Sequence, residues 1–398
     1  MLGGALAQIP AILKAKEMGL YVITCDYLPD NPGHKYADEY YNVSTTDKEA
    51  VLDLARNIGI DGVVCYASDP AAPTAAFVAE QLGLPTSPYK SVNILSNKDL
   101  FRDFLRNNGF KTPKSISCGS LEEAIAKSAQ LTYPVIVKPV DSSGSKGITK
   151  LERNEDLVAC VKKAFGFSRC KRIIMEEFVE SVGAPLAGDG FSVNGNLAFW
   201  AFADDYFDPT SKNPLAPVAE LYPYSQPQNI QLKVIAEIQR LLTLLGMKNS
   251  AYNFEARIDK EGDVVLMEVG PRNGGNGIPI ATKYATGVDM IEYTIKSALG
   301  DDCSDLSFCD VKGYWSTYMV HSNIGGRLIE IQIDEEYSRK NLVDFATNYN
   351  PGDYIPVFDG SNGSLGTMIS KFDSYEDMLY KMTHFEDFVK VVVKTESC

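Results

Sequence analysis

The sequence predicts a mixed α/β protein with more than one domain, and three observations support this. At roughly 150 residues per domain, a chain of 398 residues suggests two or three domains. Apolar residues make up 45% of the chain, which is ample for buried cores. Over the first ~90 residues, strand-like and helix-like stretches alternate, a pattern typical of a parallel sheet with helical crossovers.

Charge and composition argue against several classes of protein. The 38 Lys and Arg residues and 52 Asp and Glu residues give a net charge of −14. Such a surface repels a phosphate backbone, which argues against nucleic acid as a partner. No apolar run reaches the length of a membrane span, and the start of the chain lacks the basic leader of a signal peptide. We therefore expect a cytoplasmic protein with no membrane partner.

The cysteines and histidines do not form a recognisable metal or disulfide pattern. Only three histidines occur, at positions 34, 321 and 384, and no two are close in sequence. The cysteines contain no CxxC pair, so we expect them to be reduced, with neither a disulfide framework nor a zinc site. They are Cys25, Cys65, Cys118, Cys160, Cys170, Cys303, Cys309 and Cys398.

The N-terminal segment alternates between strand and helix patterns. MLGG would end a first strand, which is so short that we expect the chain to begin a few residues into it. AQIPAILKAKEMG predicts an amphipathic helix closed by Gly19, and PTAAFVAEQLG predicts another. YVITCD and DGVVCYASD predict strands. GGALAQ followed by Asp26 lacks the GxGxxG spacing, which disfavours a nicotinamide-dependent oxidoreductase.

The middle of the chain continues with both element types. SNKDLFRDFLRNNG predicts a helix with Ser96 as its N-cap and Lys98 in its first turn, and SLEEAIAKSAQ predicts a second capped helix. YPVIVKPV and RIIMEEFVES predict strands, and FSVNGNLAFWAFA predicts two strands about an Asn-Gly turn. Residues 204–227, rich in proline and aromatics, predict a long ordered loop. After about residue 305 the chain is mixed α/β again and ends in the strand VKVVV. An amphipathic helix precedes that part, with Ile230, Val234, Ile238, Leu241 and Leu245 on one face.

A loop of serines and glycines follows a lysine in VIVKPVDSSGSKGITK, residues 135–150. Lys138 precedes this loop, so the segment is not a Walker A motif, in which the lysine closes the loop. Successive backbone amides in such a loop make an anion nest, and small residues permit a close approach. The segment therefore predicts a phosphate site.

The stretch AYNFEARIDKEGDVVLMEVG predicts a β-hairpin that turns at Glu261-Gly262. In the expected register Phe254 faces Val269, Ala256 faces Met267 and Ile258 faces Val265, so one face is uniformly apolar. This face should pack on a core.

Two glutamates on the other face of this hairpin are the sharpest sign of a site. Glu255 should lie directly opposite Glu268, with Cβ atoms about 5 Å apart, where like charges are destabilising. Mg²⁺ suits such a gap, because it takes oxygen ligands and keeps waters or phosphates in its other positions. The alternative is that one glutamate pairs with Arg257 or Arg272 and no metal binds.

Arg272 follows in the segment EVGPRNGGNG. Its planar guanidinium can hold a phosphoryl or carboxylate group through two donors. The glycines after it let the backbone approach a ligand, or else cap the following helix.

In their order and spacing, these segments resemble the ATP-grasp superfamily, whose members join a carboxylate to an amine or thiol through an acyl-phosphate. The last hundred or so residues, with GSNGSLGTMISKFDSYEDML, look most like the C-terminal lobe of the L-amino acid ligase group. EVGPRNGG is close to the EVxPR segment of carbamoyl-phosphate-synthase-like members. The resemblance implies an α/β and α+β fold. It implies a Rossmann-like domain at 1–95, an ATP-grasp domain at 96–305 with a small lid subdomain at about 110–180, and a C-terminal lobe at 306–398.

The resemblance also implies roles for individual residues. Lys98 and Lys138 would bind ATP phosphates, and Arg272 would steady the transferred phosphoryl group. Glu255 and Glu268 would bind Mg²⁺, with Mn²⁺ as an alternative. The flexible lid over the phosphates would comprise Ser142, Ser143, Gly144, Ser145, Lys146 and Gly147. Adenine would be bound by Glu176, through its amino group, and by the backbone of Glu177 and Val179.

The chain departs from the family pattern at two positions. Gly270 stands where many members have an asparagine that binds a second metal. Gly190 stands where many have a glutamate for the ribose hydroxyls, and Asp189, one residue earlier, is the candidate substitute.

The expected function is that of an ATP-dependent carboxylate–amine ligase acting on an amino acid or small carboxylate. The aromatic residues Tyr206, Phe207, Tyr222 and Tyr224 would help to shape the acceptor pocket. One alternative is a carbamoyl-phosphate-synthase-like or biotin-carboxylase-like subunit that activates bicarbonate. Another is a non-catalytic nucleotide-binding protein. The resemblance implies small-molecule substrates and a homodimer.

Overall fold

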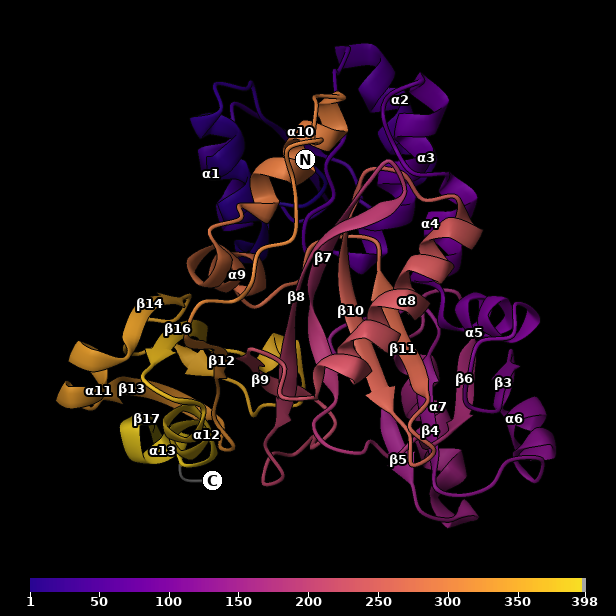
Figure 1. Cartoon of the computed structure of the whole chain (residues 1–398), viewed down its shortest axis with the longest axis vertical. Helices are drawn as coiled ribbons and strands as arrows, with labels where there is room; N and C mark the ends of the chain where they lie inside the picture. The colour runs from indigo at the N-terminus through magenta and orange to yellow at the C-terminus, as the bar shows by residue number, and fades with distance from the viewer. Residues whose placement is uncertain (396–398) are drawn as a thin grey trace.

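The structure, a computed structural model, describes residues 1–395, and Cys398 lies outside the described residues. In this part of the chain the strands form four sheets (Figure 1). The N-terminal segment lies at the top of the view, the small sheet at the lower right and the C-terminal lobe at the lower left. A large antiparallel sheet runs between them.

The N-terminal segment is built on a short parallel pair of strands. β1 (Ile23–Asp26) pairs in parallel with β2 (Glu39–Asn42), and Leu2 makes single bridges to Cys25 and Cys65. The surrounding helices are α1 (Ile9–Glu17), α2 (Lys48–Ile58), α3 (Ala72–Leu82) and α4 (Tyr89–Ser96). The parallel pairing that the alternating pattern predicts is therefore present.

Two predicted elements of this segment do not form regular strands. MLGG contributes only the bridges of Leu2, and DGVVCYASD only the bridge of Cys65. An apolar cavity of about 580 Å³, lined by Val22, Val51 and Val63 among others, lies along these two stretches. A regular strand forms only where several consecutive residues pair with a neighbouring segment. Here Leu2 is the single residue through which both stretches pair.

The helix that carries Lys98 begins one residue later than expected. α5 (Lys98–Asn107) has Asn97 as its N-cap, and no side chain donates or accepts a capping bond there. The prediction of Ser96 as N-cap is wrong, because Ser96 is the last residue of α4 and has helical backbone. An N-cap residue needs extended backbone, which Asn97 has.

The small sheet forms one subdomain with its own apolar core. Its strand order is β3-β6-β4-β5, all antiparallel. The predicted cap of its first helix is confirmed, since Ser120 accepts a hydrogen bond from the amide of Glu123. Its elements are β3 (Ser115–Cys118), α6 (Leu121–Ser128), β4 (Val135–Pro139), β5 (Thr149–Leu151), α7 (Leu157–Phe167) and β6 (Ile173–Glu177).

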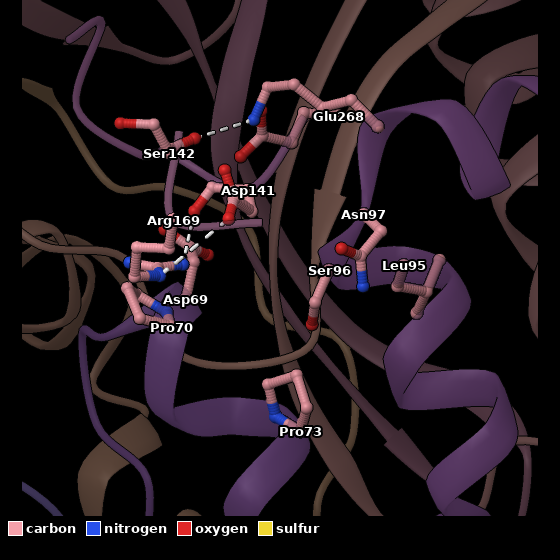
Figure 2. Close-up of a pocket in the computed structure, with 11 residues that line it drawn as sticks. Asp69, Pro70, Pro73, Leu95, Ser96, Asn97, Asp141, Ser142, Arg169 and Glu268 are labelled. Carbon is pink, nitrogen blue, oxygen red and sulfur yellow. Dashed lines mark hydrogen bonds and ion pairs between the residues drawn. The ribbon is translucent and has the colours of Figure 1, made fainter. Parts of the chain in front are cut away.

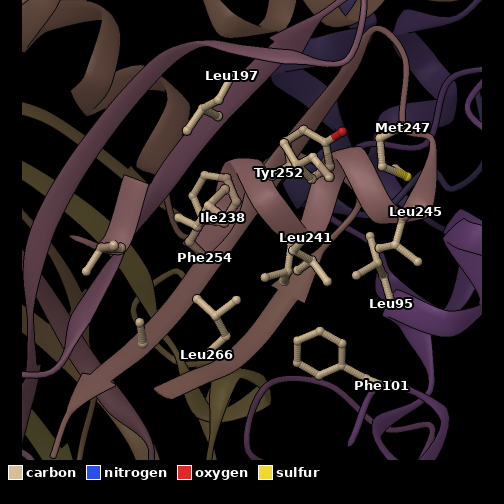
Figure 3. Close-up of a cluster of buried hydrophobic side chains, with 14 of the residues drawn as sticks. Leu95, Phe101, Leu197, Ile238, Leu241, Leu245, Met247, Tyr252, Phe254 and Leu266 are labelled. Atoms are coloured by element: carbon tan, nitrogen blue, oxygen red, sulfur yellow. The ribbon is translucent and has the colours of Figure 1, made fainter. Parts of the chain in front are cut away.

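The large sheet carries most of the site. Its order is β11-β10-β7-β8-β9-β12-β16-β14. Long helix α8 (Gln228–Leu245) covers one face, where its predicted apolar residues pack against Tyr252, Phe254 and Leu266 (Figure 3). Its strands are β7 (Leu186–Val193), β8 (Asn196–Phe207), β9 (Pro217–Tyr222), β10 (Ser250–Ile258), β11 (Val264–Gly270), β12 (Tyr314–Val320), β14 (Leu342–Thr347) and β16 (Gly366–Phe372).

The other face of the large sheet packs partly on α9 (Ile278–Thr286), with α10 (Met290–Leu299) beyond it. The C-terminal lobe adds a small sheet of order β15-β13-β17. Its elements are β13 (Gly326–Ile333), α11 (Glu335–Lys340), β15 (Tyr354–Ile355), α12 (Tyr375–Thr383), α13 (Phe385–Phe388) and β17 (Val389–Lys394). Within residues 1–395, no helix has the length and apolar character needed to cross a bilayer.

Two predictions about the large sheet need correction. Residues 204–227 are not one long loop, because β8 continues to Phe207 and β9 begins at Pro217. The hairpin of β10 and β11 keeps the expected register only up to Glu255; beyond it Ala256 faces Leu266, so a bulge leaves Met267 unopposed. The carbonyls of Leu266 and Met267 at this bulge accept hydrogen bonds from Arg102, which takes the place of a strand partner.

Candidate active site

The candidate site lies on the face of the large sheet that α8 does not cover. It lies near the edge of the sheet formed by β10 and β11. Glu255 and Glu268 are direct partners across these strands, as the sequence predicts. Asn253 on β10 is the partner of Asp189 on β7, which places Asp189 on the same face. Burial, and then the charge of Glu268, raises the pKa of Glu255 to about 7.

Lys98 supplies the positive charge next to this pair. Its Nζ lies 2.9 Å from Oε2 of Glu268 and donates a hydrogen bond of 3.0 Å to the carbonyl of Ser142. Burial alone would lower the pKa of Lys98, but Glu268 outweighs it and the pKa is raised. The expected alternative partners, Arg257 and Arg272, do not form an ion pair with either glutamate within the described residues.

A small cavity of about 50 Å³ opens beside Lys98. It brings together groups from five separate parts of the chain (Figure 2). Its charged lining consists of Asp69, Lys98, Asp141, Arg169 and Glu268. Two cations and the start of the serine-glycine loop thus face this cavity together with three carboxylates.

Arg272 is held by a residue that the sequence analysis missed. Its Nε and Nη2 donate to Oδ1 and Oδ2 of Asp69 at 2.7 and 2.6 Å. Burial would raise the pKa of Asp69, but the charge of Arg272 lowers it below its usual range. Asp69 directly follows the strand-like run DGVVCYAS. An acidic residue at the end of a predicted strand was the sequence feature that could have identified it as a site residue.

The same ion pair explains the departure at Gly270. A Cβ atom at this position would lie 3.0 Å from Oδ1 of Asp69 and 3.3 Å from Cζ of Arg272. An asparagine here would therefore require the ion pair to shift.

Lys138 and Glu176 form part of a buried charge cluster. Nζ of Lys138 lies 2.7 Å from Oε2 of Glu176, and Nε of Arg102 lies 2.8 Å from Oε1. Burial alone would raise the pKa of Glu176, yet Arg102 and Lys138 lower it to about 2. The carboxylate of Glu176 is thus the counter-ion of both cations, and its expected contact with an adenine amino group stays a prediction.

The chain after Glu176 is held tightly to its neighbours. The amide of Glu177 donates to the carbonyl of Lys114, and its carboxylate accepts from the amide of Thr132. The carbonyl of Val179 accepts a hydrogen bond from Arg257. These bonds fix the segment expected to border adenine.

The predicted lid, residues 142–147, contacts two other loops. The carbonyl of Gly144 accepts from the amide of Ser361 at 3.3 Å, and Oγ of Ser145 donates to the carbonyl of Leu215 at 3.4 Å. Nδ2 of Asn213 donates to the carbonyls of Ser145 and Asp359 at 3.3 and 3.4 Å. The lid is therefore tied to the loop between β8 and β9 and to the C-terminal lobe.

The six lid residues differ in what they contribute. Gly144, Ser145 and Gly147 have positive φ, and a Cβ at Gly147 would lie 3.0 Å from the ring of Phe167. Burial and the charge of Arg169 lower the pKa of Lys146. The turn conformation of these residues lets consecutive amides point to one side of the loop.

Hydrogen bonds from neighbouring residues hold the side chain of Asp189 in place. It is fully buried, and its carboxylate accepts hydrogen bonds from the amide of Gly274 and from Asn253. Burial raises its pKa to about 7. It therefore braces the glycine loop after Arg272, and the expected ribose contact stays a prediction. A side chain at Gly190 would point to the opposite face, with its Cβ 2.6 Å from the ring of Phe254, so a glutamate does not fit there.

The aromatic residues of 204–227 divide between the two faces of the sheet. Tyr224 is buried in the core under α8, so it does not line an acceptor pocket. The hydroxyl of Tyr222 donates to Oε2 of Glu220 at 2.8 Å. Tyr206 and Phe207 end β8 and are half-buried.

The glutamate pair fits a divalent metal ion. Two directly opposed carboxylates offer oxygen ligands, and their mutual repulsion is relieved by a cation. The described residues contain no cluster of three or more His, Cys, Asp or Glu side chains arranged for a metal. The remaining ligands of such an ion would have to come from water or phosphate, as is usual for Mg²⁺.

Comparisons with known proteins agree with this geometry. Residues 131–280 match the model of the ATP-grasp domain family. The formate-dependent phosphoribosylglycinamide formyltransferase of Synechococcus sp. (strain WH7803) is 30% identical over 183 residues, which cover 45% of this chain and 47% of that protein. The carbamoyl phosphate synthase large chain of Clostridium beijerinckii is 23% identical over 311 residues, 76% of this chain and 28% of that protein. The chain thus spans about half the length, or less, of these curated relatives.

Solved structures match the chain along nearly its whole length. The L-amino acid ligase from Bacillus licheniformis has a TM-score of 0.81 and 22% identity, covering 99% of this chain and 98% of that chain. The phosphoribosylglycinamide synthetase from Anaerococcus prevotii has a TM-score of 0.74 and 20% identity, with the same coverage. These likenesses confirm the predicted α/β and α+β fold class. Residues 131–280 thus match the ATP-grasp domain family, and the chain as a whole has the fold of these solved structures.

Proposed function

We propose that this protein is an ATP-dependent ligase that joins a small carboxylate, such as an amino acid, to an amine through an acyl-phosphate. One observation carries the proposal. Nζ of Lys98 lies 2.9 Å from Oε2 of Glu268 and 3.0 Å from the carbonyl oxygen of Ser142, the first residue of the serine-glycine lid. A triphosphate needs cations, a metal-binding carboxylate pair and backbone amides at one place, and these elements converge here. The relatives named above are likewise synthases, synthetases, transferases or ligases by name.

In this proposal ATP lies between the small sheet and the large sheet. Lys98 and Lys138 bind its phosphates, and residues 142–147 close over them. The backbone of Glu177 and Val179 borders the adenine, and Glu176 holds Lys138 in position and opposes the lowering of its pKa by burial. Asp189 acts through the glycine loop, which it holds by the amide of Gly274.

Glu255 and Glu268 would hold Mg²⁺, with Mn²⁺ as an alternative. The ion would supply charge neutralisation at the phosphates. The two glutamates keep their carboxylates on the site face, and Lys98 lies beside one of them. Arg272, fixed by Asp69, presents a guanidinium to the transferred phosphoryl group.

The reaction divides into two steps. An oxygen of the substrate carboxylate attacks the γ-phosphorus of ATP, and the bond from that phosphorus to the bridging oxygen of ADP breaks. The neutral amine nitrogen then attacks the acyl carbon, and the carbon–oxygen bond to phosphate breaks as the C–N bond forms. The nitrogen gives up one proton in this step, and inorganic phosphate leaves. The lid excludes water from the acyl-phosphate, and positioning contributes most of the rate.

We also propose the domain limits 1–95, 96–305 and 306–398, a cytoplasmic location and a homodimer. The separate sheets of the small subdomain and the C-terminal lobe support the division. Light scattering, which measures the molar mass of the protein in solution, tests the dimer directly.

A hydroxamate assay tests the proposed activity. The protein is incubated with Mg-ATP and hydroxylamine against a panel of amino acids, small acids and bicarbonate, and ADP and hydroxamate are measured. We expect ADP and a trapped hydroxamate with one class of acid, both lost in Glu268→Gln. Glu261→Gln, at the exposed tip of the same hairpin, is the matched control. ADP formed with bicarbonate alone would instead favour a bicarbonate-activating enzyme, and ATP binding without turnover a nucleotide-binding protein.

A further inference from the structure

A second group of carboxylates lies on the site face of the large sheet, two strands away from the glutamate pair. Asp205 on β8 is the direct partner of Glu220 on β9, and Glu220 is the partner of Thr317 on β12. Direct partners project from the same face of a sheet. Two carboxylates therefore stand side by side, where like charges oppose each other.

Asp205 is buried without a hydrogen-bond partner. Its side chain is 9% exposed, and its Oδ1 has no donor within reach among the described residues. A buried carboxylate oxygen almost always has a donor, because water no longer supplies one. The missing donor is the observation that points to a ligand.

Neighbouring cations are engaged elsewhere. Arg257 donates to the carbonyl of Val179 and lies over the ring of Phe178, 4.9 Å from its centroid. Lys98 pairs with Glu268. Within residues 1–395 no lysine, arginine or histidine forms an ion pair with Asp205 or Glu220.

Glu220 is positioned from the other side. The hydroxyl of Tyr222 donates to its Oε2 at 2.8 Å and leaves Oε1 available. Burial, followed by the charges of Glu255 and Glu220, raises the pKa of Asp205 well above its usual range, in agreement with carboxylates crowded together.

The pair also lies close to the reacting end of the proposed ATP site. On this face of the sheet, the neighbour of Glu255 across the strands is Ala187 on β7. The next residue across is Ala203 on β8, the direct partner of Ala187. Only these two small side chains of the sheet separate Glu255 from β9. A group bound by Asp205 and Glu220 would therefore lie on the same face of the sheet as the glutamate pair.

We propose that Asp205 and Glu220 form the subsite that binds the ammonium group of the amine substrate. The inference rests on the proposed ligase function and names the charge of its acceptor. An ammonium group brings up to three N–H donors, which match the unpaired Oδ1 of Asp205 and the free oxygen of Glu220. Its positive charge would favour the ionised form of both carboxyl groups, which their burial and crowding otherwise disfavour.

The first test separates amine recognition from acyl-phosphate formation. Asp205→Asn and Glu220→Gln are compared with wild type in two assays: hydroxamate formation with hydroxylamine, which is uncharged at neutral pH, and amide formation with a panel of amino acids and alkylamines. We expect hydroxamate formation to change by less than threefold and the KM for charged amines to rise at least tenfold. Glu330→Gln, on the exposed strand β13, should change neither. An equal loss in both assays, or no loss in either, would overturn the inference.

A binding measurement needs no turnover and keeps the two proposals separate. Saturation-transfer NMR with ethylammonium chloride is run in the presence of ADP, with tetramethylammonium chloride as a cation that lacks N–H donors. We expect wild type to bind ethylammonium alone, and both variants to bind it at least tenfold more weakly while keeping the wild-type melting temperature within a few degrees. Equal binding by wild type and variants, or equal binding of both cations, would refute the subsite even if the ligase assay succeeds. Absence of hydroxamate with every acid would refute the proposed function, and the NMR result would still decide whether the subsite exists.

Discussion

The carboxylate of Asp69 and the guanidinium of Arg272, 203 residues apart in the chain, form a two-point ion pair at 2.7 and 2.6 Å. This pair ties the N-terminal segment to the glycine loop that follows β11. It also occupies the space into which a side chain at Gly270 would project. The placement of the proposed phosphoryl-binding arginine thus depends on a residue outside the ATP-grasp match at 131–280.

Asp69→Asn should lower both stability and activity. The change leaves the guanidinium of Arg272 mostly buried without its counter-charge, which costs up to about 3 kcal/mol of unfolding free energy. We expect a lower midpoint of chemical denaturation and at least a tenfold lower kcat for ATP-dependent hydroxamate formation. Asp103→Asn, which breaks an exposed ion pair with Arg106, should cost less than about 1 kcal/mol. Similar effects of the two substitutions would contradict the role given to Asp69.

Gly270→Asn restores a residue that many relatives in the superfamily carry, yet it should impair this protein. Its Cβ would lie 3.0 Å from Oδ1 of Asp69, so the ion pair with Arg272 must shift. We expect a loss of about 1–3 kcal/mol in unfolding free energy, as for other overpacked sites. The double variant Gly270→Asn with Asp69→Ala should lose less than the sum of the two single variants. Additive losses in that double-mutant cycle would show that the two positions do not compete for space.

Much of the fold follows from local signals in the sequence. Ser120 caps α6, Asn194-Gly195 turns the hairpin of β7 and β8, and the apolar stripe of α8 meets the sheet as predicted. These features depend on residues a few positions apart, where backbone geometry and periodicity decide the outcome. The register beyond Glu255 failed because a distant arginine, Arg102, bonds the carbonyls of the bulge.

The site was predictable only as a set of residue types. Motifs identified Lys98, Lys138, Glu255, Glu268 and Arg272, and the structure brings Lys98 to Glu268. The partners of the charged groups were not predictable, because they come from segments far away in sequence. Arg102 reaches Glu176 across 74 positions, and Asp69 reaches Arg272 across 203. The roles of these residues toward ATP, and the domain limits, stay predictions.

Because of Glu220, the free energy of unfolding should fall as the pH rises. Its partial burial, and then the charges of Asp189 and Glu255, raise its pKa from 4.5 to about 8. Between these two values the folded chain holds a proton that the unfolded chain has released, so its contribution to stability is full below about pH 4.5 and is lost as the pH rises toward 8. Denaturation midpoints measured from about pH 5 to about pH 8 should therefore fall less steeply for Glu220→Gln than for wild type. Glu261→Gln is the control, and parallel pH profiles for Glu220→Gln and wild type would show that Glu220 titrates normally.

Asn213 should govern how well the lid protects the acyl-phosphate. Its Nδ2 joins the carbonyl of Ser145 in the lid to that of Asp359 in the C-terminal lobe, and Asn213 itself is buried. Asn213→Ala removes both bonds, and at about 1 kcal/mol each or somewhat less, the lid should open several-fold more often. We expect the KM for ATP to rise on the order of fivefold and more ATP to be hydrolysed for each amide formed, because water then reaches the acyl-phosphate. Asn323→Ala removes contacts to Asp208 and Thr210 in the same loop without touching the lid, and it should leave the ratio of ADP to amide at the wild-type value. An unchanged ratio in Asn213→Ala would mean that the contacts of Asn213 do not hold the lid closed during the reaction.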